Sequence, residues 1–153
     1  MITYLKGDAT APQIKGNKFI LQVCNDIGAY GAGFSGALSH KWNIVKEEYQ
    51  NIPKEKRIVG NYQIIKVEDD ILVANMIGQN GTGFNEYNVP PVNYGAIEVM
   101  LKKIFKLAKE NKATVCMPKI GAGLAGGSWE IIELVILRAL RETDVDVYVY
   151  EFE

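Results

Sequence analysis

The chain has 153 residues, of which 48% are hydrophobic and 23% charged, and its 17 basic and 18 acidic side chains leave a formal net charge of −1. This composition predicts one globular domain over residues 1–153 and differs from that of a disordered chain. Because no block of Lys and Arg occurs, we expect binding neither to a nucleic-acid duplex nor to an anionic membrane.

The N-terminus and the cysteines indicate the compartment. Residues 1–6 follow a strand pattern and lack the charged and then apolar layout of a signal peptide, and no apolar run is long enough to span a bilayer. Cys24 and Cys116 lie far apart without metal-ligand spacing, and His40 is the single histidine. We therefore expect reduced thiols in a cytoplasmic protein that uses no metal and no cofactor.

The first half of the chain is predicted to contain four strands and one helix. Short runs rich in β-branched and aromatic residues predict strands at residues 2–6 and 19–23. A helix is expected over residues 32–49, because apolar side chains recur on one helical face through this range. Residues 62–67 and 71–75 flank a polar turn and should pair as an antiparallel hairpin.

The second half is predicted to alternate helices and strands. Helices are expected at residues 93–111 and 128–141, and strands at residues 114–117 and 145–152. The helix over 128–141 is apolar nearly all round, so we expect it to be deeply packed. Helices that connect buried strands favour an α/β fold with a mixed, mostly parallel central sheet and helices on both faces. In such sheets, ligands bind at the carboxyl ends of the strands.

Two of the predicted strand-to-helix connections, residues 28–36 and 121–127, contain far more glycine than a turn requires. Glycine lets a ligand approach the backbone, and the amides of such loops and the following helix N-terminus suit phosphate oxygens. The alternative is that the glycines only permit tight turns and close packing. Neither loop has the dinucleotide-binding order of glycines or the Lys-Ser or Lys-Thr of a P-loop. Two such loops at one predicted edge favour an anion site.

With these residues assembled, the sequence resembles the macrodomain family, which binds ADP-ribose. The likeness is greatest to the branch of ADP-ribose 1″-phosphate phosphatases and ADP-ribosyl-glutamate hydrolases. It extends over residues 2–152 and rests on the order and spacing of Lys6-Gly7-Asp8, Val23-Cys24-Asn25-Asp26 with Gly31-Ala32-Gly33, and the segments 73–79 and 117–129. The resemblance implies a three-layer α/β/α macrodomain whose partner is ADP-ribose, ADP-ribose 1″-phosphate or an ADP-ribosylated protein.

The resemblance also implies roles for individual residues. Asp8 should accept a hydrogen bond from the adenine amino group, with capping of the turn that follows as the alternative. Asn25, Asn75 and Gln79 should face the distal ribose, although Asn25 could instead stabilise its own loop. The diphosphate should lie between two sets of loop residues, namely Gly31, Ala32, Gly33 and Phe34 on one side and Gly121, Ala122, Gly123, Leu124 and Ala125 on the other.

Hydrolysis would need a group that takes a proton from water. Asp26, at the mouth of the first glycine loop, is the candidate catalytic carboxylate, and Asn25 lies beside it. The alternative is that Asp26 binds backbone amides for structural reasons.

The family's glutamate-cleaving hydrolases use a lysine after the middle strand and an aspartate in the second glycine loop. Here those regions hold Met76-Ile77-Gly78-Gln79 and Ala125, and Gln22 stands where some phosphatases have a histidine. We therefore expect a hydrolase of ADP-ribose 1″-phosphate that forms no lysine adduct. The alternatives are a non-catalytic ADP-ribose reader and a de-ADP-ribosylating hydrolase without the lysine–aspartate pair.

Overall fold

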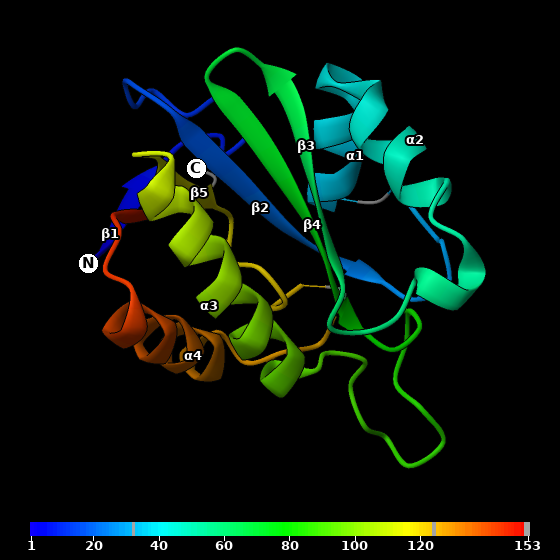
Figure 1. Ribbon diagram of the computed structural model, residues 1–153. Coiled ribbons are helices and arrows are strands. Elements are labelled where there is room, and N and C mark those ends of the chain that lie inside the picture. The colour runs from blue at the N-terminus through cyan, green and yellow to red at the C-terminus, as the bar shows by residue number, and fades with distance from the viewer. Residues whose placement is uncertain (32, 124, 152–153) are drawn as a thin grey trace.

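The computed structural model describes residues 1–31, 33–123 and 125–151. Within these ranges, six strands form one sheet in the spatial order β1-β6-β5-β2-β4-β3. The strands are β1 (Ile2–Lys6), β2 (Lys18–Asn25), β3 (Tyr62–Glu68), β4 (Ile71–Gln79), β5 (Thr114–Met117) and β6 (Val147–Glu151). The helices are α1 (Gly33–Lys41), α2 (Asn43–Gln50), α3 (Tyr94–Glu110) and α4 (Trp129–Glu142), with a short 3-10 helix η1 (Lys54–Lys56) (Figure 1).

The sheet is mostly parallel. Strands β1, β6, β5, β2 and β4 pair in parallel, and β3 pairs antiparallel with β4 across a turn at Asp69 and Asp70, which confirms the predicted hairpin. Parallel strands are covered on both faces and therefore carry nearly continuous apolar runs. In β2, Phe19 and Leu21 join one buried cluster and Ile20 joins the other, because successive side chains point to opposite faces. The predicted mixed, mostly parallel sheet is confirmed.

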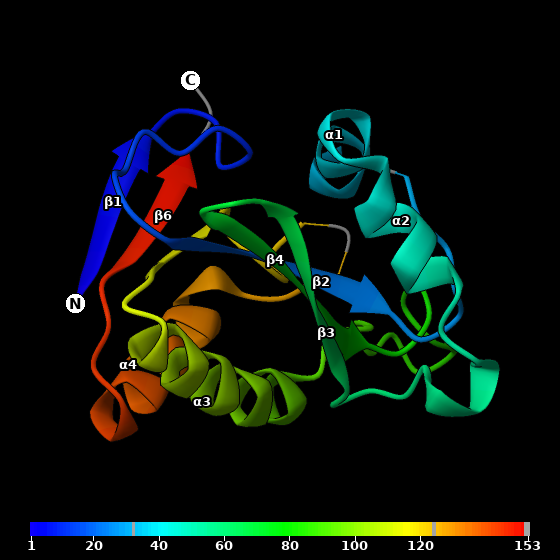
Figure 2. The ribbon, with the colours of Figure 1, turned by 45° about the horizontal axis from the view of Figure 1, so that its top comes forward.

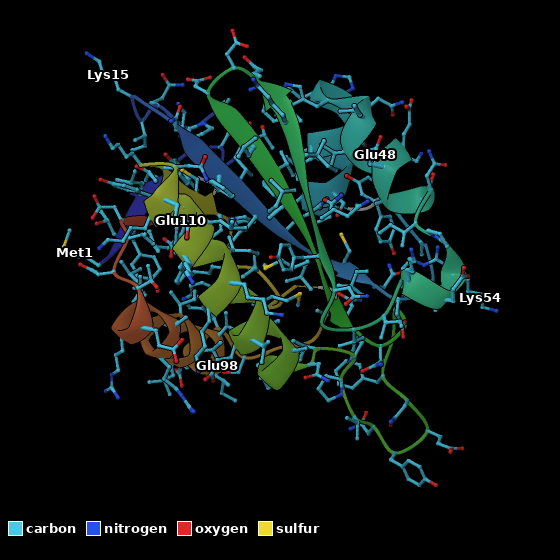
Figure 3. The ribbon with its side chains drawn as sticks, viewed as in Figure 1. Met1, Lys15, Glu48, Lys54, Glu98 and Glu110 are labelled. Carbon is cyan, nitrogen blue, oxygen red and sulfur yellow. The ribbon has the colours of Figure 1, made fainter. Side chains whose placement is uncertain are left out.

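The helices cover the two faces of this sheet separately, α1 and α2 on one face and α3 and α4 on the other (Figure 2). Leu38 of α1 is fully buried in the cluster that contains Ile20, whereas Leu101 of α3 is fully buried in the opposite cluster. Figure 3 shows the same separation, with Glu48 of α2 and Glu110 of α3 on opposite sides of the sheet. The expected three-layer α/β/α arrangement is confirmed.

The single helix predicted over residues 32–49 is wrong, because the structure has two helices, α1 and α2. Trp42 between them has an extended backbone, with φ −138° and ψ 90°. Its N–H still donates to the Leu38 carbonyl, and its carbonyl accepts from the Val45 N–H, so the spacing of apolar residues continues across the break. Periodicity alone could not reveal the interruption. The Trp42 indole donates to Glu68 on β3, a contact between segments distant in sequence.

The prediction that the last helix is deeply packed is also wrong. One face of α4 is buried, including Ile132 and Val135, but Ile131, Leu134 and Leu137 are 43%, 59% and 43% exposed. As α4 lies in an outer layer, its inner face already fills the available core, and the remaining apolar side chains point to solvent. No helix in the described ranges combines the length and the apolar character needed to cross a membrane.

Two strands extend further than predicted, which matters for the site. β2 continues to Asn25 rather than ending at residue 23, and β4 continues to Gln79 rather than ending at residue 75. Asn25 and Gln79 are register partners across the β2–β4 pair, after a shift between Cys24 and Asn25. Their side chains therefore lie together at the carboxyl edge of the sheet, where the glycine loops begin.

Candidate ligand-binding cleft

A cleft of about 470 Å³ lies at the carboxyl edge of the parallel strands. Both glycine loops line it, as do the ends of β2 and β4. Of the residues predicted to bind a ligand, it is lined by Asn25, Gly31, Gly33, Phe34, Gln79, Gly121, Gly123 and Ala125. Ala122 is not among the lining residues, and Ala32 and Leu124 lie outside the residues that the structure describes. The fold thus brings together two loops almost a hundred residues apart in sequence.

The side chain of Asn25 shapes the first glycine loop. Its Oδ1 accepts hydrogen bonds from the backbone N–H groups of Ile27 (3.0 Å) and Ala29 (3.1 Å), and its Nδ2 donates to the Ala29 carbonyl at 2.7 Å. The buried Tyr49 hydroxyl lies 2.8 Å from the same Oδ1 and accepts from the Gly28 N–H at 3.1 Å. Asn25 therefore holds its own loop, as the alternative assignment expected, and also lines the cleft.

Replacement of Asn25 by alanine should lower the free energy of unfolding by about 1–3 kcal/mol, because the N–H groups of Ile27 and Ala29 lose their acceptor. Urea denaturation measures this change. Asn43→Ala is the matched control, because Asn43 is exposed and its amide donates to the exposed Glu47 side chain, so stability should hardly change. Equal unfolding midpoints for Asn25→Ala and the natural chain would contradict the loop-shaping role.

The second glycine loop closes on itself before α4. The Gly127 N–H donates to the Gly121 carbonyl at 2.8 Å. Gly121 has a φ of +72°, a conformation that favours glycine, and a Cβ there would lie 2.7 Å from Ile132 Cδ1, so the Ile132 side chain would have to shift. Gly123 differs, because it is exposed and a Cβ there would meet no heavy atom of the described residues within 4 Å. The loop thus has a tightly packed base and an open tip toward the cleft.

A buried amide network supports the wall of the cleft. Gln22 lines the cleft, accepts from the Ser35 hydroxyl at 2.6 Å and donates to Asn75 Oδ1 at 2.7 Å. Asn75 is fully buried, and its Nδ2 donates to the Val45 carbonyl and to Gln63 Oε1, each at 3.1 Å. The structure therefore does not bring Asn75 to the cleft, because its amide is used inside the core.

The two aspartates singled out from the sequence lie outside the lining of the cleft. Asp8 is exposed, and its Oδ1 accepts from the N–H and the hydroxyl of Thr10, each at 2.8 Å, which is the turn-capping alternative. Asp26 is partly buried, and its Oδ1 accepts from the Gly81 N–H at 2.8 Å, while its Oδ2 lies 3.5 Å from the amide of Asn80. This carboxylate ties the first glycine loop to the segment after β4.

The ionisable groups of the cleft are nearly all neutral at neutral pH. Burial raises the pKa of the Cys24 thiol, and burial also raises the pKa of Tyr30 to about 12. No acidic side chain lines the cleft in the described part of the chain, and Lys119 is its one charged lining residue there. The sequence interpretation missed Tyr30 and gave Lys119 no role. The signals were an aromatic residue amid glycines and a cation directly before the second loop.

The segment after β4 projects from the body of the molecule (Figure 1). Thr82 lines the cleft, but Phe84 and Tyr87 do not, and they are 56% and 79% exposed. A Cβ placed on Gly126 would lie 3.1 Å from the tip of the Phe84 ring, so Phe84 rests on the second glycine loop. The base of the segment thus belongs to the cleft and its tip extends into solvent.

Comparison with known sequences finds relatives over nearly the whole chain, although no family model matches it. The chain is 31% identical over 154 residues to an ADP-ribose 1″-phosphate phosphatase of Candida albicans, and the match covers 94% of each protein. It is 29% identical to a chromodomain-helicase-DNA-binding protein 1-like of Mus musculus, over 99% of this chain. The chain spans only 18% of the length of that mouse protein.

Solved structures share the fold over nearly the whole chain. A Bacteroides thetaiotaomicron protein of unknown function has a TM-score of 0.94 and 43% identity, covering 98% of this chain and 97% of its own. A macrodomain protein from Streptomyces coelicolor has a TM-score of 0.83 and 39% identity, covering 99% of both chains. The layers, the sheet and the helices described above are therefore common to these proteins.

Proposed function

Because this chain belongs to the macrodomain family, we propose that it binds ADP-ribose in the cleft between its two glycine loops. One observation carries the proposal: glycines of both loops line the same cleft of about 470 Å³, Gly31 and Gly33 on one side and Gly121 and Gly123 on the other. Helix α4 follows the second loop, so the positive end of its dipole lies near the cleft. A doubly charged diphosphate suits this arrangement of close backbone donors.

The order of the strands supports the direction of the ligand. Asp8 follows β1, whereas Asn25 and Gln79 end β2 and β4, and β6 and β5 lie between these two groups in the sheet. A ligand with its adenine at Asp8 and its distal ribose at Asn25 and Gln79 would therefore cross both glycine loops. The amides of Asn25 and Gln79 can donate and accept, which matches the hydroxyls of a ribose.

Replacement of Asp8 by alanine should weaken ADP-ribose binding by about 1.5–3 kcal/mol, the worth of one hydrogen bond to a charged group. Asp8 Oδ2 makes no hydrogen bond among the described residues, so it is available to the adenine amino group. Calorimetric titration with ADP-ribose measures the affinity. Thr10→Val is the matched control, because it removes the hydroxyl bound to Asp8 but keeps the carboxylate, and it should bind normally. An unchanged affinity of Asp8→Ala would place the adenine elsewhere.

A second function, hydrolysis of ADP-ribose 1″-phosphate to ADP-ribose and phosphate, is favoured by the similarity to the Candida phosphatase over nearly the full length of both proteins. Asp26 is the carboxylate next to the lining residue Asn25, and we assign it the proton transfer from water. Incubation with ADP-ribose 1″-phosphate and measurement of released phosphate test this function. Release above the uncatalysed background supports the hydrolase. ADP-ribose binding without release indicates a reader.

In this chain, Gln79 and Ala125 stand in the regions where the glutamate-cleaving hydrolases carry their lysine and aspartate. This difference argues against a covalent route for removing ADP-ribose from proteins. Gln79 and Ala125 both line the cleft, and the Gln79 amide donates to the Gly81 carbonyl at 2.9 Å. Neither side chain can form an adduct with an opened ribose. An ADP-ribosylated protein would therefore be bound, or hydrolysed without an adduct at these two positions, at the same cleft as free ADP-ribose.

A further inference from the structure

One ion pair lies at the rim of the cleft. Lys119 follows β5 and is the single charged side chain among the described residues that line the cleft. Its Nζ lies 2.9 Å from Oε1 of Glu151, which ends the neighbouring strand β6. The side chains of Lys119 and Glu151 are 44% and 39% exposed. The Glu151 carbonyl also accepts from the Gly7 N–H, so the pair lies between the Asp8 turn and the second glycine loop.

Because both side chains are exposed to solvent, Lys119 can leave the Glu151 carboxylate for another acceptor. Ion pairs in contact with solvent contribute little net stability, because water screens them and two long side chains lose freedom. A lysine ammonium is a compact charge on a flexible stem, with three donors that can turn to a new acceptor. A diphosphate in the cleft carries more negative charge than one carboxylate, and the loop glycines beside it present no competing side chain.

We propose that Lys119 is the charged side chain that recognises the diphosphate, and that Glu151 competes with the ligand for it. On binding, Lys119 exchanges the Glu151 carboxylate for a phosphate oxygen. Glu151 then lowers affinity for anionic ligands, while Lys119 favours charged nucleotides over uncharged nucleosides. This inference rests on the proposed binding of ADP-ribose and adds the residues that set its charge selectivity.

The competition predicts opposite effects of neutralising the two partners. Lys119→Gln should weaken ADP-ribose binding about fivefold, and Glu151→Gln should strengthen it about two- to fivefold, as expected for one solvent-screened charge interaction. The double variant should match Lys119→Gln, because Glu151 acts only through Lys119. Adenosine, which lacks phosphate, should bind all variants with the affinity shown by the natural chain. Lys106→Gln, at an exposed position of α3 outside the cleft, is the control for the change in net charge.

Calorimetric titrations at low and high sodium chloride, with thermal melting of each variant, decide the outcome. The salt dependence of ADP-ribose binding should be smaller in Lys119→Gln than in the natural chain. Weaker binding by Glu151→Gln, or unchanged binding by Lys119→Gln, would overturn the inference while leaving ADP-ribose binding intact. Failure of the natural chain to bind ADP-ribose would instead overturn the proposed function itself.

Discussion

The Gly123→Glu variant should fold normally and bind ADP-ribose at least about 100-fold more weakly, because like charges brought together in a binding site cost several kcal/mol. Gly123 lines the cleft, and a Cβ at this position would lie more than 4 Å from every heavy atom in the part of the chain that the structure describes. The new side chain therefore has room in the free protein, but it places a carboxylate where the diphosphate should lie. Calorimetric titration measures the loss, and thermal melting shows whether the fold is intact.

Two further variants test whether the new negative charge and its position in the cleft, and not general damage to the protein, cause the loss of binding. Gly83→Glu makes the same change at an exposed glycine outside the cleft lining, where a Cβ would also meet none of the described heavy atoms within 4 Å, so it should bind normally. Gly123→Gln adds similar bulk without the charge and should fall between the natural chain and Gly123→Glu. Tight binding by a folded Gly123→Glu would show that the second loop does not hold the diphosphate.

The architecture and the place of the cleft could be predicted because they follow from local patterns. The glycines of residues 28–36 and 121–127 come within a few residues of apolar runs, and the ends of parallel strands meet at one edge of a sheet. The break at Trp42 and the exposed face of α4 could not be predicted in this way. Periodicity shows which side chains share a face, but it does not show whether the backbone stays helical or whether another layer covers that face.

The role of a buried amide is a second limit of sequence reasoning. Asn75 and Gln79 are both polar residues at the end of an apolar run, and the sequence gives no reason to separate them. In the fold, Gln22 and Gln63 from two other strands satisfy the Asn75 side chain, whereas Gln79 reaches the cleft. Burial without a partner is costly, so three strands must be placed before the Asn75 side chain can be assigned to the core.

Asp8 and Asp26 show the difference between local and distant contacts. The bond from Thr10 to Asp8 spans two residues, so the turn-capping alternative could be recognised from the sequence. The bond from Gly81 to Asp26 spans 55 residues, and no local pattern indicates it. The sequence therefore identified Asp26 as a carboxylate beside the first glycine loop, but not the contact that fixes its Oδ1.

The Asp26→Asn variant should release phosphate from ADP-ribose 1″-phosphate about 10²–10⁴-fold more slowly than the natural chain. This factor is the usual contribution of a group that takes a proton from water. Asparagine keeps an oxygen that can accept from the Gly81 N–H, so the contact between the first glycine loop and the segment after β4 should persist. Stability and ADP-ribose affinity should then stay near those of the natural chain. Phosphate release under saturating substrate measures the change.

The comparison with Asp26→Ala distinguishes proton transfer from support of the loop. Alanine removes both the carboxylate and the acceptor for Gly81, so it should lose stability as well as turnover, whereas asparagine should lose turnover alone. Asp69→Asn, in the exposed turn between β3 and β4, is the control for the same chemical change away from the cleft. Full turnover in Asp26→Asn would leave Asp26 a purely structural role.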